Sequence, residues 1–224
     1  MSPSSAATQA PEDRGFRKIV PLARVQLLTD ALFALSMMVI LLQVEYPDPD
    51  IIVTDEQIRE FLVEQALAIE VFAVTFLLIA IYWVKHMEQF GYIREIDYRL
   101  LWLQLGYLLF LVLLPVLNAY AVLYPLHPLV FVSYCGVLVG MGFFSAASWR
   151  YAAKGGRLLN KAADPEVVRR IWQDALIEPV TAAAAIGVAF WSVEAGQAAL
   201  LVIPLAFGIQ RWRGKRNAQP SADR

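Results

Sequence analysis

Charge and cysteine are scarce in this chain. Only 17% of its 224 residues are charged, whereas 58% are hydrophobic and the mean hydropathy is +0.53. A soluble domain of this size needs a polar skin over its core, so the composition excludes an ordinary soluble domain. It also excludes intrinsic disorder, which requires few apolar residues. Cys135 is the only cysteine, which excludes a disulfide-stapled secreted domain.

An excess of positive charge and the motifs of known enzyme classes are also missing. The 19 Lys and Arg residues against 20 Asp and Glu leave a net charge of −1, which argues against a nucleic-acid partner. No phosphate-binding loop, zinc-ligand spacing or nucleophile elbow is present in the sequence. A membrane-embedded enzyme needs catalytic groups at one depth, yet the two histidines, His86 and His127, are expected on opposite sides of the membrane. We therefore expect neither an enzyme nor a resident cofactor.

Long uncharged runs predict an all-α, polytopic membrane protein with six transmembrane helices. A spanning helix needs about 20 apolar residues, and the run from Leu100 to Trp149 contains no charged residue. Pro125 and Pro128 divide this run into two spans joined by a tight hairpin, and the last apolar region is divided near Glu194-Ala195-Gly196. The expected spans are about residues 25–44, 61–84, 100–124, 129–149, 175–193 and 196–211.

The distribution of basic residues predicts that both termini are cytoplasmic. With six spans, every Lys and Arg except Arg59 falls on one side of the membrane. The outer segment 45–60 carries acidic residues instead, namely Glu45, Asp48, Asp50, Asp55, Glu56 and Glu60.

Two polar tails are expected to flank a transmembrane domain at residues 24–213. Residues 1–23 and 214–224 lack an apolar core and are predicted to be disordered cytoplasmic tails. In the cytoplasmic segment 150–174, Asp164-Pro165-Glu166 has the pattern of an N-cap and first turn, which predicts a short helix there.

Two acidic residues inside the apolar runs are candidates for function. An acid within the membrane is costly and needs a partner or a water-filled surrounding. Glu70 lies well inside the second span, and Asp30 lies about one turn inside the first. Arg24 is six residues before Asp30 and therefore on a different helix face. Asp30 is expected either to pair with another span or simply to reach the headgroups.

Trp83 and His86 provide candidate partners for Asp30. They stand at i and i+3, on one helix face, and both ring systems can donate a hydrogen bond. All three residues are expected at the cytoplasmic end of their spans, so an Asp30–Trp83–His86 network is one prediction. The alternative is an interfacial tryptophan beside a solvated histidine.

Three sequence motifs, one in each of the first three expected spans or beside them, resemble those of the transmembrane protein 175 family of potassium channels. Leu28 and Thr29 stand where the family motif has Phe and Ser, and Gln104 stands where it usually has Asn. The resemblance covers about residues 24–115, and the six-span plan and chain length are similar to those of the bacterial members. The motifs are Arg24-x-x-x-Leu28-Thr29-Asp30, Trp83-x-x-His86 and the stretch from Asp97 to Pro115.

The resemblance implies a homotetramer in a bacterial plasma membrane that passes monovalent cations, with potassium as the permeant ion and no cofactor. The first span of each subunit would line a central pore that is narrowed by apolar side chains and has no carbonyl filter of the usual potassium-channel kind. Leu35 would form the tightest point, followed by Met38, where the family often has Thr, and by Leu42. A polar network behind the pore would consist of Arg24, Thr29, Asp30, Trp83 and His86.

The helical spacing of the three proposed pore residues agrees in part with the pore that the resemblance implies. Leu35, Met38 and Leu42 fall on one stripe of a helix, and an apolar stripe is more commonly a packing face. Four copies around an axis would instead form apolar rings that restrict ion passage. A thioether replaces ion hydration poorly compared with a hydroxyl. The resemblance thus implies a potassium-preferring cation channel; the alternative is a small secondary transporter that uses Glu70.

Overall fold

A computed structural model describes residues 19–43, 54–160, 163–200 and 202–203. In this part of the chain the fold is all-α except for one short antiparallel pair, β1 (Ile19–Val20) and β2 (Ile96–Asp97). The α-helices are α1 (Leu22–Met38), α2 (Asp55–Gly91), α3 (Tyr98–Leu123), α4 (Pro128–Ala153), α5 (Pro165–Ala189) and α6 (Val193–Leu200). The 3-10 helices are η1 (Val39–Gln43) and η2 (Lys154–Gly156).

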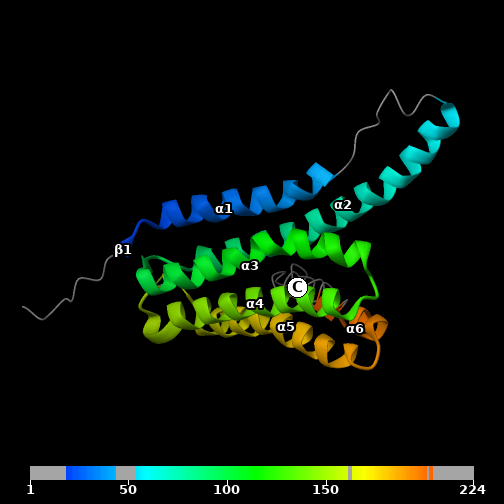
Figure 1. Cartoon of the computed structure of the whole chain (residues 1–224). Coiled ribbons are helices and arrows are strands. Elements are labelled where there is room, and N and C mark those ends of the chain that lie inside the picture. Colours follow the sequence, from blue (N-terminus) through cyan, green and yellow to red (C-terminus); the bar gives the residue numbers. More distant parts are fainter. Residues whose placement is uncertain (1–18, 44–53, 161–162, 201, 204–224) are drawn as a thin grey trace, which may run out of the picture.

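Helix α3 lies between α1 on one side and α4 on the other (Figure 1), and α5 packs against α4 and α6. The largest core cluster joins Phe33 of α1, Tyr82 of α2, Leu111 of α3 and Met141 of α4. A side chain at Gly142 of α4 would overlap the ring of Pro179 on α5, so this glycine permits the two helices to approach closely.

The two prolines separate helices where the sequence predicts a hairpin. Helix α3 ends at Leu123 and α4 begins with Pro128 at its first turn. Asp164 is also an N-cap as predicted, and its side chain accepts a hydrogen bond of 3.0 Å from the Glu166 N–H. The prediction of a short helix there was wrong, because this cap begins α5, which runs on to Ala189. The charged residues in the first turns of α5 lie outside the apolar run, but the helix continues through them.

The predicted division of the last apolar region is present, but it lies slightly before residues 194–196. The break between α5 and α6 lies at residues 190–192. Ser192 caps α6, since its Oγ accepts a 3.2 Å hydrogen bond from the Ala195 N–H. Gly196 lies inside α6 and allows close contact with the Phe131 ring and the Ala185 carbonyl. It therefore serves helix packing and does not interrupt the helix.

Helix α2 is much longer than the expected span at 61–84. Its 37 residues extend for about 55 Å at 1.5 Å per residue, and its first turns project beyond the other helices (Figure 1). A capping box between Thr54 and Gln57 begins the helix before the charged turns.

The expected tails are described only in part. Residues 19–20 form β1 and α1 begins at Leu22, so the end of the expected disordered tail at 1–23 is ordered. Residues 1–18 and 204–224, which include most of the expected sixth span, lie outside the described residues.

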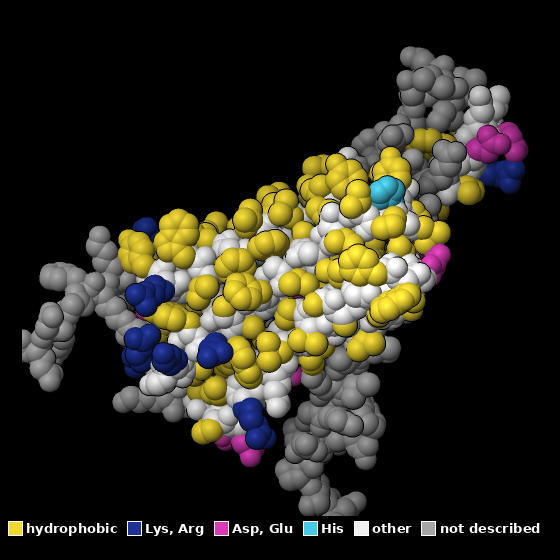
Figure 2. All heavy atoms as spheres, turned by 60° about the horizontal axis from the view of Figure 1, so that its bottom comes forward, with side chains coloured by type: hydrophobic (Ala, Val, Ile, Leu, Met, Phe, Trp, Pro, Cys, Tyr) yellow, Lys and Arg dark blue, Asp and Glu magenta, His cyan; other side chains and the backbone are white. Residues whose placement is uncertain are grey.

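Among the described residues, two helices are long and apolar enough to cross a membrane, at Tyr98–Ala121 and Pro128–Gly156. They coincide with the third and fourth expected spans, and the count of six stays a prediction. Hydrophobic side chains cover much of the face in Figure 2, while Lys and Arg side chains gather toward one end. This distribution fits a bundle whose sides meet lipid or other subunits.

Candidate functional site

Helix α1 has two different faces. Val25, Thr29, Phe33 and Ser36 are buried against the rest of the chain, where α1 packs on α2 and α3. Leu35, Met38 and Leu42 point the other way and are 56%, 61% and 83% exposed. The stripe that the sequence singles out is therefore the outward face of the first helix.

Asp30 and Trp83 are brought together as predicted. The indole Nε1–H of Trp83 on α2 donates a hydrogen bond of 2.9 Å to Oδ1 of Asp30 on α1. Asp30 is exposed and Trp83 is half-buried, so the acid keeps access to solvent while one of its oxygens is held. This contact ties the outward-facing helix to the bundle.

No hydrogen bond joins His86 to Asp30 among the described residues, so that part of the expected network stays a prediction. Nε2 of His86 lies 3.1 Å from Oε1 of Gln104 on α3, and its ring stacks on Phe90 and Tyr107 with centroids 4.2 and 5.4 Å away. His86 is buried. The histidine therefore connects α2 to α3, while Trp83 connects α2 to α1.

Arg24 and Thr29 also stand apart from the Asp30–Trp83 contact. Arg24 is exposed, and its side chain forms no hydrogen bond or ion pair with a described residue. Thr29 is buried, and its Oγ1 has no hydrogen-bond partner in the described part of the chain. Within one chain, Asp30 and Trp83 therefore form one pair and His86 pairs with Gln104. The other two residues of the predicted network, Arg24 and Thr29, join neither pair.

A buried ion pair escaped the sequence reasoning. Nζ of Lys85 on α2 lies 3.5 Å from Oε2 of Glu178 on α5. Glu178 is buried, and the Lys85 side chain keeps partial access to solvent. Glu178 could have indicated this pair, because an acid within an apolar segment requires a partner. Lys85 entered the sequence analysis only as one of the basic residues that orient the chain in the membrane.

Polar side chains also connect other helices inside the bundle. The Asn118 amide of α3 donates to Oγ1 of Thr75 on α2. Gln89 of α2 donates to the Ser145 carbonyl of α4 at 3.2 Å and accepts from the Ser145 hydroxyl at 3.3 Å. These contacts satisfy polar groups in an apolar interior and fix the helices relative to one another.

Glu70, the residue on which a transporter would depend, lies on the exposed surface of α2. No group of three or more His, Cys, Asp and Glu side chains within the described ranges could hold a metal ion. The described residues therefore offer outward apolar side chains on the first helix and buried polar contacts between helices.

Comparison with known proteins points to one family. Residues 24–115 match the TMEM175 family, described as the endosomal/lysosomal potassium channel TMEM175. The chain is 25% identical over 191 residues to a potassium channel of Chamaesiphon minutus, covering 84% of this chain and 93% of that protein. The crystal structure of a lysosomal potassium-selective channel TMEM175 homologue from Chamaesiphon minutus has a similar fold. Its TM-score is 0.68 at 19% identity, with 84% of this chain and 97% of that chain covered.

Proposed function

We propose that this chain is a member of the TMEM175 family of potassium channels, which its residues 24–115 match, and that it conducts potassium through a pore lined by α1. The same matches support a membrane channel and not an enzyme. Four copies would surround the pore, with residues 24–213 forming the transmembrane domain and both termini in the cytoplasm. The proposed location is a bacterial plasma membrane, which the bacterial relative supports.

The observation that carries the proposal is the outward apolar stripe on α1. Leu35 and Met38 lie one turn apart on α1, Leu42 follows in η1, and all three are largely uncovered by their own chain. The opposite face of α1 is buried against α2 and α3, so this helix is held at the edge of the bundle. Helices at that position can meet around an axis, with these side chains pointing inward.

Apolar rings would control ion passage by narrowness and by exclusion of water. Leu35 is proposed as the constriction, with Met38 and Leu42 forming wider rings one and two turns further along. Met38 offers only a weak thioether acceptor, so it contributes little to replacing ion hydration. Potassium preference then depends on the fit at Leu35.

The contact between Asp30 and Trp83 supports this arrangement from behind. It anchors α1 to α2 five residues before Leu35 and eight residues before Met38, through a hydrogen bond of 2.9 Å. Arg24 and Thr29 are proposed to add to this network in the assembled channel, while His86 positions α2 against α3.

The test is the current through purified full-length protein in a planar bilayer, with potassium on one side and sodium on the other. The proposal expects a non-saturating current that reverses toward the potassium equilibrium potential. Reversal near zero would retain the pore and remove the preference for potassium. Absence of current together with saturable uptake into liposomes would contradict the channel and favour a transporter based on Glu70.

A further inference from the structure

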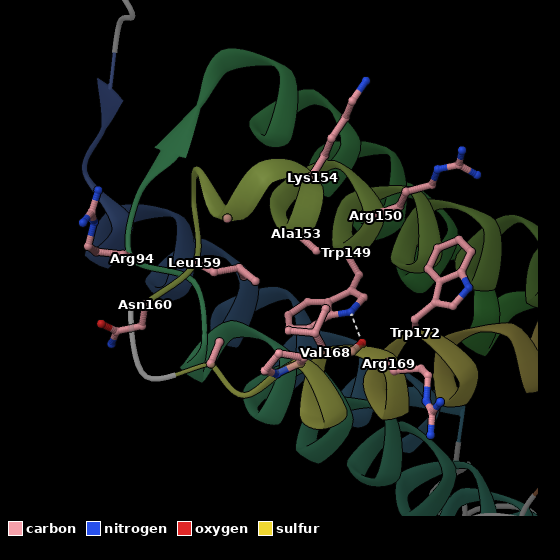
Figure 3. Close-up of a pocket in the computed structure, with 13 residues that line it drawn as sticks. Arg94, Trp149, Arg150, Ala153, Lys154, Leu159, Asn160, Val168, Arg169 and Trp172 are labelled. Atoms are coloured by element: carbon pink, nitrogen blue, oxygen red, sulfur yellow. Dashed lines mark hydrogen bonds between the residues drawn. The ribbon is translucent and has the colours of Figure 1, made fainter.

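A cavity of about 870 Å³ lies where α4, η2 and the start of α5 meet (Figure 3). Trp149, Leu159 and Val168 line its apolar interior, and Trp172 stands at its side. Its remaining charged lining residues are all basic, namely Arg94, Arg150, Lys154 and Arg169. No acidic residue lines it within the described ranges, and the proposed pore makes no use of it.

Hydrogen bonds hold the walls of this cavity in place. The Trp149 indole N–H donates to the Val168 carbonyl at 2.9 Å and so joins α4 to α5. The connecting segment is tied to the end of α2, because the Arg94 N–H donates to the Leu158 carbonyl and the Asn160 N–H to the Tyr92 carbonyl, each at 2.8 Å. The cavity is therefore a preformed feature of the fold.

Three of the four basic side chains remain available to a ligand. Arg94 forms an ion pair with Glu95 at 2.9 Å. Arg150, Lys154 and Arg169 form no ion pair with any described residue, and Arg150 instead lies 6.0 Å from the Trp172 ring centroid. In Figure 3, the Arg150 and Lys154 side chains extend on one side of the Trp149 ring and the Arg169 side chain on the other, with their charged ends directed away from the ring. Three positive charges without an ion-pair partner among the described residues thus stand around the rim of an apolar interior.

The position of the cavity along the chain places it at the edge of the membrane. Arg150 is the first charged residue after the uncharged run that begins at Leu100. The apolar helix that ends beside the cavity, Pro128–Gly156, is long enough to cross a bilayer. The cavity therefore opens at the level where lipid headgroups meet water, on the side that carries most of the basic residues.

We propose that this cavity binds the phosphate headgroup of an anionic membrane lipid. Arg150, Lys154 and Arg169 contact the phosphate, and Trp149, Leu159 and Val168 contact the glycerol and the first acyl carbons. Basic pockets between transmembrane helices have this combination of charges and apolar walls, and the volume is within the range of ligand sites. The inference rests on the membrane location in the proposed function and not on potassium conduction.

The test is lipid retention by the purified full-length protein, measured by native mass spectrometry after incubation with phosphatidylglycerol or phosphatidylcholine. We expect preferential retention of phosphatidylglycerol. The double variant Arg150→Gln/Arg169→Gln should weaken it about 25-fold, at roughly fivefold for each charge removed. The matched control is Arg99→Gln/Arg170→Gln, which removes two exposed arginines that do not line the cavity and should retain wild-type binding. Arg170 adjoins Arg169 but faces Glu88 at 3.3 Å.

A second measurement does not depend on these variants. Phosphatidylglycerol with brominated acyl chains should quench tryptophan emission of the wild-type protein, and Trp172→Phe should remove part of that quenching. Current is recorded on the same samples, so loss of lipid binding and failure of conduction are distinguished. Equal retention of both lipids, equal weakening by the control variant, or equally tight binding of soluble glycerol phosphate would overturn the proposal.

Discussion

The Trp83 indole donates a hydrogen bond of 2.9 Å to the carboxylate of Asp30, across 53 positions of the sequence. This bond joins the helix with the outward apolar stripe to the longest helix of the bundle. Only one face of α1 packs against its own chain. A single polar contact of this kind therefore contributes strongly to fixing the rotation of α1 about its helix axis. The direction in which the apolar stripe of α1 points thus depends on the hydrogen bond of the Trp83 indole N–H.

Replacement of Trp83 by Phe should loosen α1. The change removes the donor and keeps an aromatic ring, and a hydrogen bond to a charged group contributes about 1.5–3 kcal/mol. Since Asp30 is exposed, we expect a loss near the lower value, together with altered current. The measurement is the thermal unfolding of the detergent-solubilised protein. Trp102→Phe is the control, because Trp102 lies on the exposed surface of α3.

Gln104 should be needed mainly to satisfy His86. Gln104→Leu leaves the buried histidine without its 3.1 Å partner, and an unpaired buried polar group costs about 1–3 kcal/mol. The double variant His86→Phe/Gln104→Leu replaces both partners by apolar groups and should recover most of that loss. Thermal unfolding of the single and double variants checks this. Equal stability of Gln104→Leu and wild type would contradict the pairing.

The two polar pairs illustrate what sequence reasoning can and cannot reach. The cost of an acid in an apolar run made a partner from another span one of two expectations for Asp30, and Trp83 is such a partner. Trp83 and His86 share a face by spacing, yet they are about 60° apart around the helix axis. That difference is enough for one to meet α1 and the other α3. Only the positions of the neighbouring helices decide this, and local spacing does not contain them.

Helix boundaries show the same distinction. Charged residues limit where a span meets lipid, and they predicted the membrane segments as apolar runs. Helices begin and end where their caps and turn residues stand, so α2 and α5 extend several turns beyond those runs. Gly196 favoured a helix break in the sequence analysis because glycine often ends helices. Its role in contact with Phe131 depends on a helix more than sixty residues away in the sequence.

The pair of Lys85 and Glu178 should respond asymmetrically to substitution. The Glu178 side chain is 5% exposed and that of Lys85 is 26% exposed. Lys85→Met therefore leaves an unpaired buried carboxylate, and we expect a loss of roughly 2–3 kcal/mol, below the range for a fully buried pair. Glu178→Gln leaves a lysine that can reach water and should cost less.

Thermal unfolding of both single variants and of Lys85→Met/Glu178→Gln measures this asymmetry. The double variant should be more stable than Lys85→Met alone, because no buried charge remains unpaired. A shift of roughly 2–4 °C is expected for each kcal/mol in a chain of this size. A larger loss for Glu178→Gln than for Lys85→Met would contradict the proposed cause.

Met38→Thr should increase the preference for potassium. Met38 lies on the exposed stripe one turn beyond Leu35, and the substitution replaces a weak sulfur acceptor by a hydroxyl that can replace part of the hydration of an ion. We expect a shift of the reversal potential toward the potassium equilibrium potential under bi-ionic conditions. An unchanged reversal potential with wild-type expression would show that this position does not contact permeant ions.

Leu35→Ala should widen the narrowest ring of the proposed pore. Removal of the branched side chain reduces both the steric and the dewetting barriers, so current should rise severalfold while discrimination between potassium and sodium falls. The matched control is Leu41→Ala in η1, which shortens a leucine that is 45% exposed and belongs to none of the proposed rings. It should leave current and selectivity unchanged. If both variants altered the current alike, α1 would be sensitive to any loss of packing, and Leu35 would not be the constriction. If neither did, the stripe would face lipid or a neighbouring subunit, and the pore would have to be lined by another helix.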